Sequence, residues 1–250
     1  MKIQYLIAFF IFYLFFGCQS KTNASNDEII YAENIYDFER SIKLNIYTDS
    51  SYVFTISEKD PRYEKTEKFK GLCYRNLDTL YFNPFEFEYN DSKKAVIKNN
   101  FIEFIDGKYP LKIKIKKSNF PLKKDIYSDK LESYSTFTFN NKFYDCFKED
   151  VKPYDLSEKD IIEIEKILTK CFVENKNKIT RTVTEYQKQL IAVKNLQGEI
   201  EVWVNCNCKE KNEEFQYSIL DYNDGGDCHF NLKINLSKNT YSELYINGEA

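Results

Sequence analysis

Short runs in which apolar and polar residues alternate recur from about residue 41 to residue 116, and this period of two constrains the fold most. Alternation places successive side chains on opposite faces of a β-strand. The runs expected to form strands are 41–47, 51–57, 79–82, 85–89, 95–98, 101–105 and 111–116. Turn-forming residues such as Thr48-Asp49-Ser50 and Asp106-Gly107 separate them. We therefore expect an antiparallel meander that folds into a sandwich or a small barrel.

Composition supports a β-rich globular protein, because Tyr (20) and Phe (21) are abundant whereas Gly (7) and Pro (5) are few. The formal charge is -3, from 36 Lys and Arg against 39 Asp and Glu. Removing residues 1–17 would take away Lys2 and no acid, which leaves -4. A nearly neutral, slightly acidic chain has no general attraction for nucleic acid or for an anionic bilayer surface.

The pattern changes after residue 154. Residues 158–172 carry apolar side chains three and four positions apart, which predicts an amphipathic helix with Ser157 as its N-cap. Further strands are expected at 185–193, 199–208, 228–236 and 241–247, with 215–220 as a possible short fifth. This order predicts an α+β domain in which one helix packs on an antiparallel four-stranded sheet, as in cystatin-like or NTF2-like folds. That comparison concerns topology only.

The N-terminus carries a targeting signal. Lys2 precedes an apolar run over residues 3–16, which is shorter than the roughly 20 residues needed to span a bilayer. Gly17 and Cys18 follow, and this ending resembles the lipobox of bacterial lipoproteins. In that family Leu usually lies three positions before the cysteine, whereas Leu14 here lies one position earlier. The alternative is an uncleaved signal anchor.

The lipobox resemblance implies cleavage before Cys18, acyl chains on that cysteine, and attachment to a membrane. Gln19-Ser20 place no acid just after the cysteine, so the sorting pattern of lipoproteins favours the outer membrane. The expected organisation is a signal peptide (1–17), a flexible tether (18–30), an antiparallel β-domain (31–120), an irregular connector (121–154) with one strand at 135–139, and an α+β domain (155–250).

Six cysteines remain besides Cys18, and an even number in an exported chain favours disulfides. Alternation places Cys206 and Cys208 on the apolar face of strand 199–208, and Cys228 on the apolar face of the next strand. We expect one cross-strand bridge, between Cys208 and Cys228, because both lie at strand ends. Cys171, on the apolar helix face, either reaches the remaining Cys206 or stays a buried thiol.

Three kinds of functional site are conceivable for these residues, and the sequence supports each of them poorly. A zinc site would need Cys228 and His229 on one ion, but neighbours in a strand face opposite ways. The acidic loop 221–227 resembles a calcium loop and lacks the distant bidentate Glu. A cysteine nucleophile would have His229, the one His of the chain, as its only base. The sequence therefore assigns no catalytic residue, no metal site and no cofactor.

The outer face of the C-terminal sheet is the candidate binding surface. Opposite the cysteines it carries four residues whose aromatic rings and amides suit contact with a protein or a glycan: Trp203, Asn205, His229 and Tyr245. The alternative is that the β-domain or the connector packs over this face.

The C-terminal residues VWVNCNC (202–208), DGGDCHFNLKINL (224–236) and YINGEA (245–250) resemble uncharacterised lipoproteins of Bacteroidetes-type bacteria. The resemblance covers about the last hundred residues and implies no known activity. We therefore expect a non-enzymatic envelope lipoprotein that binds a protein or a glycan. The alternatives are an envelope hydrolase that uses a pair of carboxylates, and an immunity or inhibitor lipoprotein that neutralises a toxin.

Overall fold

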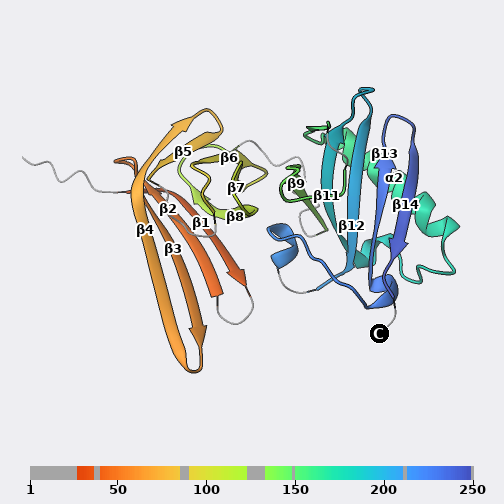
Figure 1. Ribbon diagram of the computed structural model, residues 1–250, viewed down its shortest axis with the longest axis horizontal. Coiled ribbons are helices and arrows are strands. Elements are labelled where there is room, and N and C mark those ends of the chain that lie inside the picture. Colours follow the sequence, from red (N-terminus) through yellow and green to blue (C-terminus); the bar gives the residue numbers. More distant parts are fainter. Residues whose placement is uncertain are drawn as a thin grey trace, which may run out of the picture.

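The computed structural model describes residues 27–36, 40–84, 90–122, 133–147, 150–210 and 213–248. These residues form an eight-stranded closed barrel, followed by a second sheet with a single long helix (Figure 1). The expected combination of an antiparallel β-domain and an α+β domain is confirmed. The signal segment, Cys18 and the strand expected at 85–89 lie outside the described residues.

Antiparallel neighbours build the barrel in chain order, and β1 pairs with β8 to close it. Its strands are β1 (Glu28–Tyr36), β2 (Arg40–Tyr47), β3 (Ser51–Asp60), β4 (Tyr63–Asn76), β5 (Thr79–Asn83), β6 (Lys94–Lys98), β7 (Phe101–Phe104) and β8 (Leu111–Ser118). Side chains fill the interior, among them Leu44, Tyr52 and Phe54. An eight-stranded barrel has an interior just wide enough for such a core.

Two barrel strands, β1 and β4, were not expected from the sequence. The inward side chains of β1 include small Ala32 and polar Asn34, so its alternation is weak. β4 is charged on both faces, and Cys73 is its one fully buried residue. Its first half pairs only with β3, and the two strands extend past the barrel as a ribbon (Figure 1).

Asn34 completes the barrel where backbone pairing between β1 and β8 ends. Its Nδ2 donates to the Lys112 carbonyl oxygen at 2.7 Å, and its Oδ1 accepts from the Lys114 N–H at 3.0 Å. The side chain thus takes the place of a backbone amide, which explains how a buried polar residue is tolerated inside a barrel seam.

The second sheet has more strands than the four expected. The expected strands are β11 (Tyr186–Lys194), β12 (Ile200–Cys208), β13 (His229–Asn235) and β14 (Thr240–Ile246), all antiparallel. Along the outer edge of β11, β9 (Tyr134–Thr138) pairs in parallel and β10 (Lys152–Pro153) pairs antiparallel. The connector therefore contributes strands to this sheet.

The possible fifth strand at 215–220 is wrong. That segment begins with the 3₁₀ turn η2 (Glu214–Gln216) and continues as a loop over the sheet. Gln189 of β11 holds it there, because its Nε2 donates to the carbonyl oxygens of Phe215 (2.7 Å) and Ser218 (2.6 Å). These bonds to a side chain replace the ladder that a strand would need.

Helix α2 (Glu158–Glu174) covers one face of the second sheet (Figure 1). Ser157 is its N-cap and forms a capping box with Asp160, as the sequence predicts for the cap. Ile161, Ile164 and Leu168 are buried against the even-numbered residues of β12 and β13. In the part of the chain that the structure describes, no helix is long and apolar enough to span a bilayer.

The barrel contacts the second sheet through a buried pair of opposite charges on neighbouring strands, Glu103 of β7 and Lys112 of β8. The Glu103 carboxylate accepts from the N–H and the hydroxyl of Thr138, both at 2.8 Å. The Lys112 ammonium donates to the Ser135 hydroxyl (3.0 Å) and the Thr136 carbonyl (2.8 Å). The two side chains therefore form hydrogen bonds with backbone groups of β9 on the edge that does not pair with β11.

Replacing Lys112 by Met keeps the apolar stem and removes the ammonium. We expect a loss of about 2 kcal/mol of unfolding free energy, because the Thr136 carbonyl is left without its donor and Glu103 without its counter-charge. Lys116→Met on the same strand is the matched control, since its ammonium pairs with Glu213 at the surface and should matter by less than about 1 kcal/mol. Urea unfolding followed by circular dichroism measures both, and equal losses would contradict the role given to Lys112.

Candidate functional site

Three of the four predicted surface residues line one small hollow, which we call the amide pocket. Its volume is about 210 Å³, and it lies on the sheet face opposite α2. Its walls include Trp203, Asn205, Asn207, His229 and Asn231 from the sheet, Tyr144 and Cys146 from the connector, and Asp221, Tyr222 and Asn247 from the loops around it. Tyr245 is 62% exposed on β14 and is not part of the lining.

Trp203 is half-buried under the connector and does not lie on an open sheet face. Tyr144, Cys146 and Phe147 pack with it in a separate apolar cluster. The alternative interpretation, in which the connector packs over this face, thus describes the surroundings of Trp203. Because the connector leaves a hollow beside the indole, the ring forms a wall of a pocket.

Asn205 builds the pocket wall from inside. It is buried, and its Nδ2 donates to Gln189 Oε1 (3.0 Å) and to the Leu220 carbonyl (2.7 Å). Gln189 Oε1 also accepts from the Leu220 N–H at 2.9 Å. This network fixes the loop that carries Asp221 and Tyr222. The sequence gives no sign of Gln189, because a polar residue in the middle of a central strand is indistinguishable from an outward-facing one.

His229 and Asn207 form a polar pair across β12 and β13. His229 Nδ1 lies 2.8 Å from Asn207 Oδ1, so Nδ1 carries the proton in the neutral ring and Nε2 keeps its lone pair. Asn207 is only 2% exposed, and its Nδ2 has no hydrogen-bond partner among the described residues. A buried amide donor without a partner is costly, and at a pocket wall it suggests a missing acceptor.

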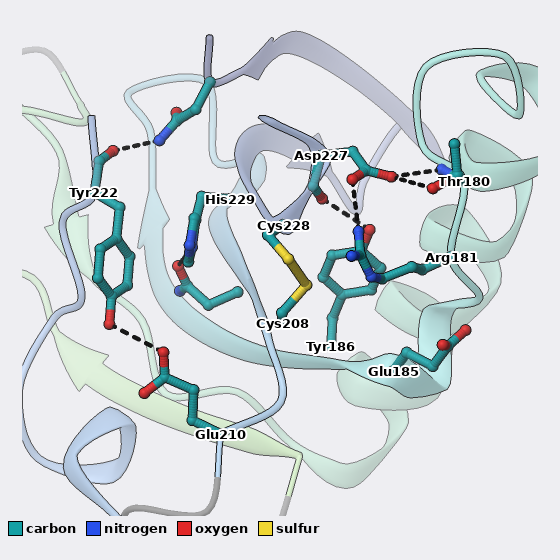
Figure 2. The surroundings of a disulfide bond; sticks show 12 residues. Thr180, Arg181, Glu185, Tyr186, Cys208, Glu210, Tyr222, Asp227, Cys228 and His229 are labelled. Atoms are coloured by element: carbon teal, nitrogen blue, oxygen red, sulfur yellow. Dashed lines mark hydrogen bonds and ion pairs between the residues drawn. A yellow bond between two sulfur atoms is a disulfide. The ribbon is translucent and has the colours of Figure 1, made fainter. Parts of the chain in front are cut away.

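Two neighbours fix the imidazole of His229 in place. The ring of Tyr222 lies against it with centroids 4.0 Å apart, as Figure 2 shows, and the Tyr222 hydroxyl reaches Glu210 at 3.4 Å. On another side, Gly225 comes so close that an added Cβ would lie 2.7 Å from the ring carbon Cδ2. Gly225 has φ +90°, a conformation that glycine adopts without strain. The Gly-Gly turn of the acidic loop therefore allows the backbone to pack closely against the His229 ring.

The disulfide between Cys208 and Cys228 is confirmed, with the two Cα atoms 4.9 Å apart (Figure 2). It joins the end of β12 to the 3₁₀ turn η3 (Gly226–Cys228) just before β13. The closed loop contains Tyr222, so the bridge limits how far one pocket wall can move. In the chain-entropy account, closing a loop of this size stabilises a protein by roughly 3 kcal/mol.

Asp227 ties the same turn to the segment after α2. Its carboxylate accepts from the Thr180 N–H and hydroxyl (2.8 and 2.5 Å) and pairs with the Arg181 guanidinium at 2.6 Å (Figure 2). These contacts, with burial opposing them, hold the pKa of Asp227 below its usual value. With Asp227 occupied in this way, the acidic loop is not arranged as a calcium loop. Among the described residues no group of three or more His, Cys, Asp or Glu is placed to hold a metal ion.

The remaining described cysteines are free: Cys73, Cys146, Cys171 and Cys206. Cys171 of α2 and Cys206 of β12 are both buried between the helix and the sheet and stay as separate thiols, which is one of the two outcomes expected for Cys171. Burial raises the pKa of Cys171 to about 11 and that of Cys206 to about 12. At neutral pH both are inert, protonated side chains.

Cys146, His229 and Asn207 all line the amide pocket, a set of residue types that cysteine hydrolases use. The electrostatics differ from those of such enzymes. Burial, above all, raises the pKa of Cys146 to about 12, whereas a nucleophilic cysteine needs a lowered pKa. Where the structure shifts carboxyl pKa values among the described residues, it lowers them, at Glu185, Glu199, Glu213 and Asp227. A carboxylic acid that donates a proton needs the opposite shift.

Comparison with known proteins gives no family for the chain: no family model matches it, and neither a curated protein nor a solved structure does.

The pKa of His229 should lie below 6.5, mainly because burial disfavours the charged ring, although Glu210 and Asp224 favour it. Between pH 6.5 and that lower value the unfolded chain binds a proton that the folded chain does not, so folding stability should fall as the pH falls. An NMR titration of the Hε1 resonance gives the value without assignment, because the chain has one His. The urea-unfolded protein is the reference, and a folded-state pKa at or above it would contradict the buried, neutral ring.

Proposed function

We propose that the chain is a lipid-anchored envelope protein that binds one polar unit of a larger ligand, such as a sugar ring of a glycan, in the amide pocket. The observation that carries this proposal is the Nδ2 of Asn207, a buried donor at a pocket wall without a partner in the described structure. Asn207 lines the pocket but its Nδ2 is shielded from solvent, so a ligand oxygen would bond to it after a small shift of the Asn207 side chain. The proposal is for binding without catalysis.

The size and lining of the amide pocket support a small, hydroxyl-rich ligand. About 210 Å³ corresponds to roughly seven water molecules at about 30 Å³ each. That space suits one sugar ring and is smaller than the roughly 300 Å³ or more of a pocket for a drug-sized molecule. Asn207 and Asn231 can donate and accept hydrogen bonds, and the rings of Trp203 and Tyr222 offer flat apolar surfaces.

The membrane anchor is a separate part of the proposal and rests on the sequence around Cys18. The described barrel begins with β1 at Glu28, so the link between the acylated cysteine and the folded body would be short. A short tether would keep the amide pocket near the membrane surface, in reach of envelope glycans. Stable attachment requires more than one acyl chain, which the lipoprotein pathway provides.

Ligand binding can be followed through Trp203, the only Trp of the chain. Titration with N-acetylglucosamine and with chitobiose should change its fluorescence, because the indole lines the pocket. Asn207→Ala should weaken binding by about tenfold, which corresponds to the roughly 1.4 kcal/mol of one good hydrogen bond. Tyr245→Ala is the control, since Tyr245 is exposed on the same sheet and outside the pocket. No fluorescence change with any sugar, or equal loss in both variants, would refute a glycan site.

Lipid attachment can be tested in a bacterium that processes lipoproteins. Cells fed an alkyne-labelled palmitate should label the wild-type protein, and the Cys18→Ala variant should carry no label and leave the membrane fraction. Mass spectrometry of the native protein should find an N-terminal peptide that begins at an acylated Cys18. An intact Met1, or an unmodified sulfur at Cys18, would contradict the anchor and leave the pocket proposal standing.

A further inference from the structure

A second and larger hollow lies where the barrel meets the second sheet, and we call it the junction pocket. Its volume is about 520 Å³. The barrel contributes the last residue of β1 and residues of β7, β8 and the turn between them, and the other walls come from β9, the connector and the loop after η2. Tyr144 and Asp221 line both this pocket and the amide pocket, so the two hollows are neighbours. Binding sites commonly form at such places between domains.

Aromatic rings dominate the walls of the junction pocket: Tyr36, Phe137, Phe139, Phe143, Tyr144 and Tyr217. Several of them are held in place by the barrel contact. Tyr36 and Tyr217 pack edge to face with centroids 5.1 Å apart, and the Tyr217 hydroxyl donates to the Ile35 carbonyl. The walls are therefore apolar surfaces with electron-rich faces.

The charged groups of the junction pocket are mostly acidic. Glu103, Asp106 and Asp221 line it, and Asp106 and Asp221 are exposed to solvent. Among the described residues of the lining, Lys112 is the one basic residue, and it is 5% exposed. Burial, above all, and then the charge of Glu103 raise the pKa of Tyr144, so its phenol stays neutral. The pocket thus presents carboxylates to a ligand, whereas the Lys112 ammonium is buried and bonded to β9.

The surroundings of Lys112 show that an ammonium group can be accommodated at this junction. Its ammonium lies 4.1 Å from the ring centroid of Phe101 and 4.2 Å from that of Phe137. The ammonium also donates to two oxygens, those of Ser135 and Thr136. A desolvated ammonium between aromatic faces is a favourable cation–π arrangement. The remaining walls of the pocket repeat these elements, aromatic rings with oxygen acceptors.

We infer that the junction pocket binds a small organic cation, an ammonium or guanidinium group on an apolar body. The apolar part would lie against the aromatic walls, and the positive charge would face Asp106 and Asp221 at the exposed side. An anionic ligand would meet three carboxylates and find Lys112 already engaged by β9. A neutral ligand of the same shape would gain the apolar contacts alone. This inference does not depend on the function proposed for the amide pocket.

Calorimetric titration of the purified full-length protein with three probes of equal shape tests the inference. Phenethylammonium should bind, 2-phenylethanol should bind more weakly, and phenylacetate should show no binding. Binding of the ammonium should weaken as the salt concentration rises. Equal affinity for the three probes, or a preference for phenylacetate, would overturn the assignment of a cation site. A blocked Ala-Lys-Ala peptide and free alkylamines in further titrations distinguish a peptide side chain from a free amine as the source.

Single substitutions place the cation within the pocket. Asp106→Asn and Asp221→Asn should each weaken phenethylammonium binding by about fivefold, as expected for one partly exposed charge pair. Asp106 has φ +66°, and Asn adopts this conformation at least as readily, so the fold should persist. Glu64→Gln, which removes one exposed charge on the β4 ribbon, is the control and should leave phenethylammonium binding unchanged.

Unchanged affinity in both Asp variants would refute this site. Sugar binding monitored at Trp203 in the same variants reports separately on the amide pocket.

Discussion

The edge strand β9 is the element on which both halves of the molecule depend. A strand paired on one side only leaves a row of backbone groups that must find other partners. Here the partners are two charged side chains from the barrel, Glu103 and Lys112. Burying a charge without partners would cost several kcal/mol, whereas here both charges form hydrogen bonds to the same strand. Each domain therefore satisfies polar groups that the other would leave buried and unpaired.

Both hollows result from the way the chain continues after β9. The connector crosses the sheet face, places Phe147 and Cys146 beside Trp203, and sets Tyr144 between the two pockets. From the other side, Gln189 and Asn205 hold the loop at 215–221 against the sheet. Without these contacts the face would be a flat row of rings and amides. The recesses thus arise from irregular segments fixed on a regular sheet, a common origin of binding sites.

Local pattern predicts much of this architecture. Alternation places Val202, Val204 and Cys206 under α2 and leads to the Cys208–Cys228 bridge, because strand period and cysteine position are both readable from neighbouring residues. Ser157 is recognisable as a cap for the same reason. β1 and β4 could not be predicted. β1 closes the barrel with few large apolar side chains, and the first half of β4 lies in a solvated ribbon, so neither strand shows clear apolar alternation. For the amide pocket, the sequence predicts only the sheet face on which it lies, and no hollow. Its depth depends on Gln189, Tyr144 and Tyr222, which are distant in sequence, and on a connector that follows no periodic pattern.

The parallel pairing of β9 with β11 also has a consequence for the order of assembly. The rest of the connector, β10 and α2 separate these two strands in the chain, whereas each barrel strand pairs mostly with its immediate successor. Local pairings form quickly, and pairings across long intervening segments form slowly. During synthesis the barrel also emerges first. We therefore expect a nascent form in which the barrel is complete while the carboxylate of Glu103 and the ammonium of Lys112 are still hydrated, because β9 has not yet docked against them.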